Sequence, residues 1–226
     1  MLTEFLERLI LFNTGLAVAA GLFGLVRYRR LAPSWRWLAL LAGFDALMEV
    51  VYGLLSALKV HNLFLNPFVS VGEIVLLTLL YRQVLQSAVF NRVVPWLLGL
   101  FGLYALLQTP LKLDVVHLAV SLEIVANLIQ LVLAGLYFQK LLNELRVEHL
   151  PRDPFFWFSV ALAAYGLGNI LISLFSNYLF AHCTEQLQKI VFWGVRNVFN
   201  IQLYLAYILV LWARPVPTNA GDTELA

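Results

Sequence analysis

The stretch HNLFLNPFVSVGEIVLLTLLYRQ, residues 61–83, decides the fold class. It belongs to an almost wholly apolar run, and about 20 such residues are enough for a helix to cross the hydrocarbon core of a bilayer. Glu73 lies near the middle of this run. A carboxyl group at that depth is costly in lipid, so we expect it to face the interior of a helical bundle or a water-filled cavity.

The composition of the whole chain is that of an integral membrane protein. The 226 residues are 62% hydrophobic and 12% charged, and the mean hydropathy is +0.83. A soluble domain is typically about 45–50% apolar and about 25% charged. The net charge of +2 comes from basic residues in short segments between apolar runs, so nucleic acid is not an expected partner. The single cysteine, Cys183, excludes an internal disulfide.

The fold class predicted is an all-α integral membrane bundle of seven transmembrane helices. The predicted spans are Phe5–Val26, Trp35–Leu58, Leu63–Leu85, Val93–Gln108, Val115–Phe138, Phe155–Leu179 and Lys189–Trp212. The fourth is the shortest, is bracketed by Pro95 and Pro110, and has almost no polar residues, which predicts a peripheral position. The first is interpreted as a retained span, because MLTEFLER has acids where a signal peptide has basic residues. Residues 1–212 are thus one membrane domain, and residues 213–226 are expected to form a disordered cytoplasmic tail.

The basic residues predict the orientation. Cytoplasmic loops of membrane proteins carry an excess of Lys and Arg. Ten fall on one side of the predicted spans: Arg27, Arg29, Arg30, Arg36, Arg82, Arg92, Lys140, Arg146, Arg152 and Arg214. Four fall on the other: Arg8, Lys59, Lys112 and Lys189. We therefore expect a multi-pass protein of the bacterial inner (cytoplasmic) membrane, with the N-terminus outside and the C-terminus in the cytoplasm.

Polar residues recur on single faces of the spans. Residues three and four apart share a helix face, which groups Asp45, Glu49 and Tyr52, then Asn66, Ser70 and Glu73, then Tyr165 and Asn169, then Arg196, Asn200 and Tyr207. At 1.5 Å per residue these groups reach one level, somewhat outside the bilayer midplane. We expect a ligand pocket there, with ten candidate residues: Asp45, Glu49, Tyr52, Asn62, Glu73, Glu123, Asn169, Arg196, Asn197 and Asn200.

Charge is unbalanced in this predicted pocket. Arg196 is the only cationic partner expected for Glu73 within the spans, since pairing lowers the cost of burying either group. Four acids nevertheless face one base. Asp45 and Glu49 lie one helical turn apart, so at least one of them is expected to be protonated at neutral pH unless a cation occupies the site.

Simpler interpretations remain open. Polar side chains often only bridge membrane helices, at about 0.6 kcal/mol on average. His61 and His117 are weak candidates for metal ligands with Glu73 or Glu123, and interfacial histidines are the plainer interpretation. No cofactor is expected.

The pattern resembles a family of small, largely uncharacterised bacterial seven-helix membrane proteins. It is carried by Glu49, HN at 61–62, Glu73 followed by LY at 80–81, SLEIVANL at 121–128, DPFFWFSVALAAYGLGNILISLFSNYL at 153–179 and WGVRNVFNI at 193–201. The family's recurrent polar positions correspond to Glu49, Asn62, Glu73, Glu123, Asn169, Asn177, Asn197 and Asn200, whereas Arg196 stands where that family has Asn or His. Because the same module occurs there fused ahead of sensor histidine kinases, the resemblance implies a sensory role.

Three functions are compatible with the sequence. The first is a sensory or ligand-binding protein that takes a small polar or cationic ligand, or senses protons, and signals through a partner docked on the cytoplasmic segment QKLLNELRVEHLPRDP, residues 139–154. The second is a small proton-coupled transporter; polar residues become sparse below Asp45, which counts against it. The third is an intramembrane enzyme acting on lipid, though no Ser or Cys has an evident His base. The expected partners are the lipid bilayer, the ligand, a cytoplasmic signalling protein and a second copy of the chain.

Overall fold

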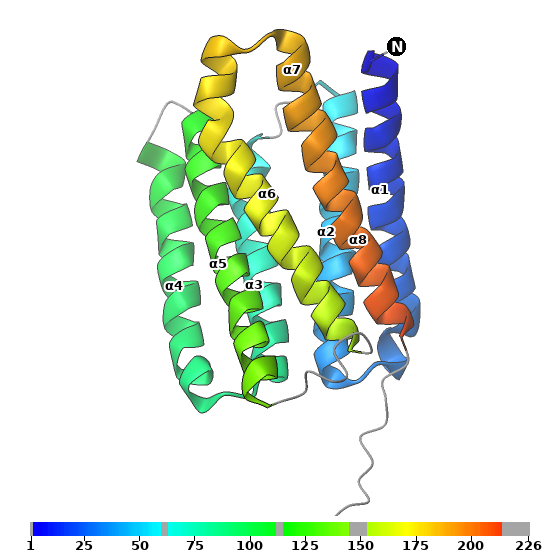
Figure 1. Cartoon of the computed structure of the whole chain (residues 1–226), viewed down its shortest axis with the longest axis vertical. Coiled ribbons are helices and arrows are strands. Elements are labelled where there is room, and N and C mark those ends of the chain that lie inside the picture. The colour runs from blue at the N-terminus through cyan, green and yellow to red at the C-terminus, as the bar shows by residue number, and fades with distance from the viewer. Residues whose placement is uncertain (1, 60–62, 112–114, 145–152, 214–226) are drawn as a thin grey trace, which may run out of the picture.

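The fold is an all-helical bundle, described here from a computed structural model of the chain (Figure 1). The structure describes residues 2–59, 63–111, 115–144 and 153–213. The principal elements are α1 (Leu2–Arg27), α2 (Pro33–Ala57), α3 (Asn66–Leu85), α4 (Ala88–Leu111), α5 (Val115–Asn143), α6 (Pro154–His182), α7 (Glu185–Lys189), η4 (Ile190–Val195) and α8 (Arg196–Trp212). Two 3-10 turns, η1 (Tyr28–Arg30) and η2 (Leu63–Leu65), precede α2 and α3.

The prediction of an all-α bundle with seven helices long and apolar enough to cross a membrane is confirmed for these residues. Seven helical segments are long and apolar enough to span a bilayer, the last of them running without a break through α7, η4 and α8. Local signals account for several of their ends. Proline stands in the first turn of α2, α3 and α6, where its missing N–H removes no helical hydrogen bond. Asp153 caps α6 by accepting a hydrogen bond from the backbone N–H of Phe155.

Six helical segments close into a ring. Its order is α1, α2, α3, α5, α6 and α8, each packed against the next, with α8 returning to α1. At the closing contact the Arg27 guanidinium donates hydrogen bonds to the carbonyls of Leu211 (2.7 Å) and Trp212 (3.0 Å). The N-terminus lies at the same end of the bundle as the connection between α6 and α7 (Figure 1).

Helix α4 lies outside this ring, as predicted. It packs mainly against α3 and leaves apolar side chains such as Trp96, Leu100 and Leu106 exposed. It is longer than the sequence indicated, because it begins at Ala88 and continues through Pro95. Proline is tolerated inside membrane helices when the freed backbone group finds another partner, so Pro95 does not mark the helix start.

Small residues bring α1 and α2 close together. Gly21 faces the middle of α2, and a Cβ atom at Gly21 would stand 2.6 Å from the Cβ of Ala46 and 3.0 Å from the carbonyl oxygen of Ala42. Gly24 approaches Ala39 somewhat less closely, since a Cβ atom there would stand 3.1 Å from the Cα of Ala39. In lipid, where apolar surface gives helices no preference for one another, such small-residue contacts are a main source of packing energy.

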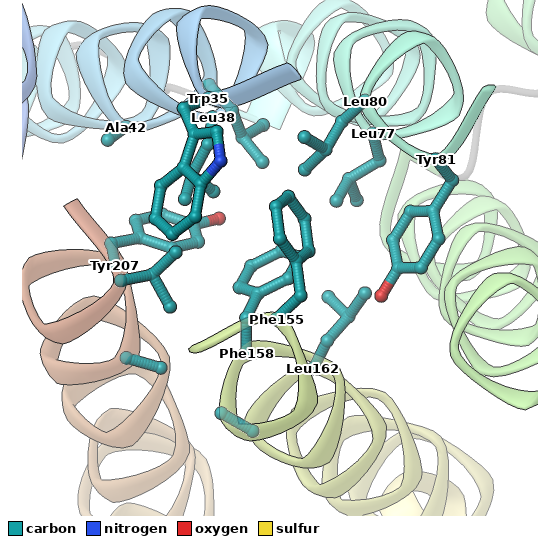
Figure 2. Packing of buried hydrophobic residues seen from close by; sticks show 14 of the residues in the cluster. Trp35, Leu38, Ala42, Leu77, Leu80, Tyr81, Phe155, Phe158, Leu162 and Tyr207 are labelled. Carbon is teal, nitrogen blue, oxygen red and sulfur yellow. The ribbon is translucent and has the colours of Figure 1, made fainter. Parts of the chain in front are cut away.

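The half of the ring away from the N-terminus is filled by apolar side chains (Figure 2). Leu38, Leu77, Phe158 and Leu162 point into its centre from α2, α3 and α6, and each is at most 2% exposed. Two of the polar atoms here pair with each other, since the hydroxyls of Tyr81 and Ser159 lie 2.9 Å apart. This half, called the apolar half below, is solidly packed.

The close approach of α1 and α2 generates a prediction. Gly21→Val should lower the unfolding temperature of the purified protein, because overpacking a tight contact costs about 1–3 kcal/mol. Gly99→Val is the matched control, since a Cβ at Gly99 on α4 meets nothing within 4 Å. Thermal unfolding in detergent would report both, and an equal effect of the two changes would mean that α1 and α2 do not meet at Gly21.

Candidate functional site

A cavity of about 260 Å³ lies inside the ring, in the half nearer the N-terminus. Five helices line it. The lining residues are Asp45, Met48, Glu49 and Tyr52 on α2; Asn66, Val69, Ser70 and Glu73 on α3; Glu123, Ala126 and Asn127 on α5; Tyr165 and Asn169 on α6; and Arg196, Asn200 and Tyr204 on α8.

Most of the candidate residues meet at this cavity. Eight of the ten line it: Asp45, Glu49, Tyr52, Glu73, Glu123, Asn169, Arg196 and Asn200. Asn197 does not belong to the lining, and its side-chain amide donates instead to the carbonyl of Trp193. Asn62 and His61 lie outside the described residues, as do the side chains of His117 and Asn177.

The two acids of α2 accept hydrogen bonds from tyrosines of α8. The Tyr207 hydroxyl donates to Asp45 Oδ2 (2.9 Å), and the Tyr204 hydroxyl donates to Glu49 Oε1 (3.2 Å). Glu49 also receives longer hydrogen bonds from Asn13 and Thr14 of α1. These contacts explain how two carboxyl groups one turn apart are accommodated, since each has its own donors.

Arg196 pairs with Glu123, not with Glu73 as predicted from the sequence. The guanidinium Nη2 lies 2.5 Å from Glu123 Oε1, and the two side chains are 33% and 29% exposed. The pair joins α8 to α5, which are not neighbours in the ring, because α6 packs between them. Glu73 and Arg196 lie at a similar depth along their helices, but depth alone does not predict a pair. It leaves open where each helix stands in the ring.

A π-helical segment sets the direction of Arg196. Segment η4 immediately precedes it, and the backbone N–H of Arg196 itself closes a π turn by donating to the carbonyl of Val191. A π turn contains one more residue than an α turn, and such turns are frequent at functional sites. The sequence IVFWGV carries no evident signal for it, and a regular helix is the structure that its composition predicts.

Glu73 differs from the other three acids. Within the described residues, no hydrogen bond or ion pair reaches its carboxylate, although Asn66 on the same helix accepts a hydrogen bond from Tyr52 (2.7 Å). Asp45, Glu49 and Glu123 line the same cavity as Glu73, and Arg196 is the only cationic residue among the described lining residues. A carboxyl group left in this way is costly inside a membrane protein.

Below the cavity lies a small hollow of about 20 Å³. It separates the cavity from the apolar half, and its walls are Leu41, Asp45, Glu73, Leu77, Tyr165, Asn200, Leu203, Tyr204 and Tyr207. That volume is about what one water-sized group needs. Asp45 and Glu73 thus face one confined space as well as the larger cavity.

Several buried polar atoms of the lining residues have no hydrogen-bond partner in the part of the chain that the structure describes. They are Asp45 Oδ1, Asn169 Oδ1 and Arg196 Nε. Most buried polar groups in proteins are hydrogen-bonded, and an unmade bond costs about 1–3 kcal/mol. Two of the three atoms are acceptors, so the site has a surplus of hydrogen-bond acceptors.

The candidate set omitted several lining residues that the spacing had already placed on the right faces. Asn66 and Ser70 share the face of Glu73, and Tyr165 shares that of Asn169. Tyr204 is not in the group formed by Arg196, Asn200 and Tyr207, yet it lines the cavity. The described residues contain no group of three or more His, Cys, Asp or Glu side chains that could hold a metal ion.

The Arg196–Glu123 pair gives a testable prediction. Arg196→Gln and Glu123→Gln should each destabilise the protein, and the double variant should lose less than the sum, with a coupling of about 0.5–3 kcal/mol typical of residues in contact. Arg196→Gln combined with Glu73→Gln is the matched cycle, and its effects should be closer to additive. Unfolding free energies of the variants measure both, and stronger coupling to Glu73 would contradict the observed pairing.

Comparison with known proteins gives no relative from which a function could be transferred. No protein-family model, curated protein or solved structure matches this chain. The cavity is therefore interpreted from the chemistry of its own residues.

Proposed function

We propose that this chain is an integral membrane sensory protein that binds a small cationic ligand in the cavity. The observation that carries the proposal is the site's charge: four carboxyl groups and one guanidinium line a single cavity of ligand size. The guanidinium is already paired with Glu123, so the remaining carboxyl groups determine which ligands are favoured. A cation bound there would offset the cost of burying them.

The proposal includes the orientation of the bundle in the membrane, with the cavity on the outer side. The predicted excess of basic residues lies at the end of the bundle remote from the cavity, as Arg27, Arg36 and Arg82 exemplify. Under the positive-inside rule that end is cytoplasmic, and the cavity lies in the outer half of the bilayer of a bacterial inner membrane. A ligand would reach it from outside.

Sensing fits the packing better than transport does. Beneath the cavity the route narrows to the hollow, and beyond it the apolar half is filled by buried side chains such as Leu38, Leu77 and Phe158 (Figure 2). A carrier needs a polar path that can open to each side in turn, and these residues offer none. A receptor needs only one accessible side.

Signalling would then pass through a partner at the basic end. Helix α5 ends at Asn143 and α6 begins at Pro154. A hydrogen bond connects the two helices at this end of the bundle. The Tyr137 hydroxyl of α5 donates to Asp153 Oδ2 (2.6 Å), the same residue that caps α6. Most of the predicted docking segment, residues 145–152, lies outside the described residues.

Ligand charge provides the main test. In lipid nanodiscs, small organic cations should raise the unfolding temperature of the wild type, whereas neutral and anionic compounds of the same size should not. Ser70→Phe places an aromatic ring in the cavity and should abolish the shift. Leu100→Phe places the same ring on the exposed face of α4 and should preserve it. Stabilisation by anions instead of cations would contradict the proposal.

Transport is tested separately. Proteoliposomes containing the wild type should take up no more of a bound radiolabelled cation than empty liposomes or liposomes with Ser70→Phe, with or without an imposed proton gradient. Uptake that depends on the gradient and is lost in Ser70→Phe would assign the cavity to a carrier.

A further inference from the structure

Glu73 is the acid of the site that the protein itself leaves unsatisfied. The other three each accept at least one hydrogen bond from an arginine or tyrosine of α8, at distances of 2.5–3.2 Å. Glu73 receives none within the part of the chain that the structure describes. A group held at such a cost, with no internal partner, is expected to have a partner that the polypeptide does not supply.

The small hollow defines where such a partner fits. Glu73 and Asp45 both line it, and its volume of about 20 Å³ admits one non-hydrogen atom with its attached hydrogens. It opens beside the 260 Å³ cavity, since both spaces share Asp45, Glu73, Tyr165, Asn200 and Tyr204. A ligand can therefore place one small end group in the hollow and the rest of its atoms in the cavity.

The hydrogen-bonding groups around the hollow are mostly acceptors. The hydroxyls of Tyr204 and Tyr207 already donate to carboxylates, so each can offer a further partner only its oxygen lone pairs. Asp45, 7% exposed, leaves Oδ1 without a partner. Asn169, which lines the adjoining cavity and is 1% exposed, donates to the carbonyl of Tyr165, and its Oδ1 has no partner among the described residues.

An end group that matches this arrangement must be small, positively charged and a donor in several directions. A primary ammonium group has three N–H donors and no acceptor. A quaternary ammonium group has the charge but no N–H donor, and with its methyl groups it is larger than the volume of the hollow. A guanidinium group is planar and much larger than one water-sized space.

We propose that the ligand is a primary amine whose ammonium group binds in the hollow between Glu73 and Asp45. This inference rests on the proposed function, in which the adjoining cavity holds the ligand. Glu73 supplies the ion pair, and the acceptor oxygens of Asp45, Tyr204 and Tyr207, which line the same hollow, take the remaining N–H groups. The Arg196–Glu123 pair lines the same cavity and is left intact.

The experiment compares matched pairs of probes on the full chain in nanodiscs. Methylamine, n-butylamine, 1,4-diaminobutane and phenethylamine are each titrated beside their N-trimethylated counterparts, in potassium phosphate buffer free of other amines. Unfolding temperature and calorimetric titration give the affinities. At least one primary amine should bind about 30-fold or more tightly than its trimethylated counterpart, because leaving buried acceptors unpaired and enlarging the head group both weaken binding.

Variants of Glu73 locate the ammonium group. Glu73→Gln should weaken binding of the amine about 30-fold or more, as loss of one partner of a buried charge pair does. Glu185→Gln removes one carboxylate from an exposed position of α7 and should leave the affinity unchanged. The empty Glu73→Gln protein should unfold at a higher temperature than the empty wild type, because an unpaired carboxyl group has been removed. A residue with only a structural role would show the opposite change.

The outcomes separate the two proposals. Equal binding of amines and their trimethylated counterparts, or full affinity in Glu73→Gln, would overturn the ammonium site and leave the cation-binding cavity standing. Stabilisation by sodium in place of potassium, lost in Glu73→Gln, would show that the hollow is a metal-ion site and would also overturn it. Failure of every cation to bind the wild type would overturn both.

Discussion

The placement of carboxyl groups inside an apolar bundle is the constraint on which the rest of the structure depends. Ionisable groups at membrane depth require partners or water, and this chain meets the requirement differently for each acid. Glu123 has Arg196, whereas Glu49 and Asp45 have tyrosine hydroxyls of α8. Helix α8 thus provides the main donors of the site, and it lies between α6 and α1 in the ring.

The two halves of the ring have different physical roles. In the apolar half, interlocked side chains such as Leu38, Phe158 and Leu162 give the helices a fixed spacing. That spacing holds the opposite half open around its cavity, where few apolar groups are available to fill the centre. The apolar half therefore supports the half that contains the cavity, as a packed scaffold supports a site built on it.

The sequence allowed the helices and the level of the site to be predicted, but not the angular arrangement. Hydropathy predicts spans well because a lipid-exposed backbone must satisfy its hydrogen bonds within a helix, and spacing on a helix face grouped Asp45 with Glu49. Pairing is different, since it depends on which helices are neighbours. The order of the ring, with α4 excluded and α3 against α5, brought Glu123 rather than Glu73 to Arg196. The π segment η4 could not be predicted either, because IVFWGV is an ordinary apolar stretch.

The π segment also changes the relative direction of two cationic side chains on the last membrane-spanning segment. Lys189 and Arg196 are seven residues apart, a separation that places two side chains on nearly the same side of a regular α-helix. The additional residue of η4 shifts the helical phase by about 100°. Lys189 can therefore form its ion pair with Glu185 at the exposed α7 end of the segment, while Arg196 faces the interior of the bundle.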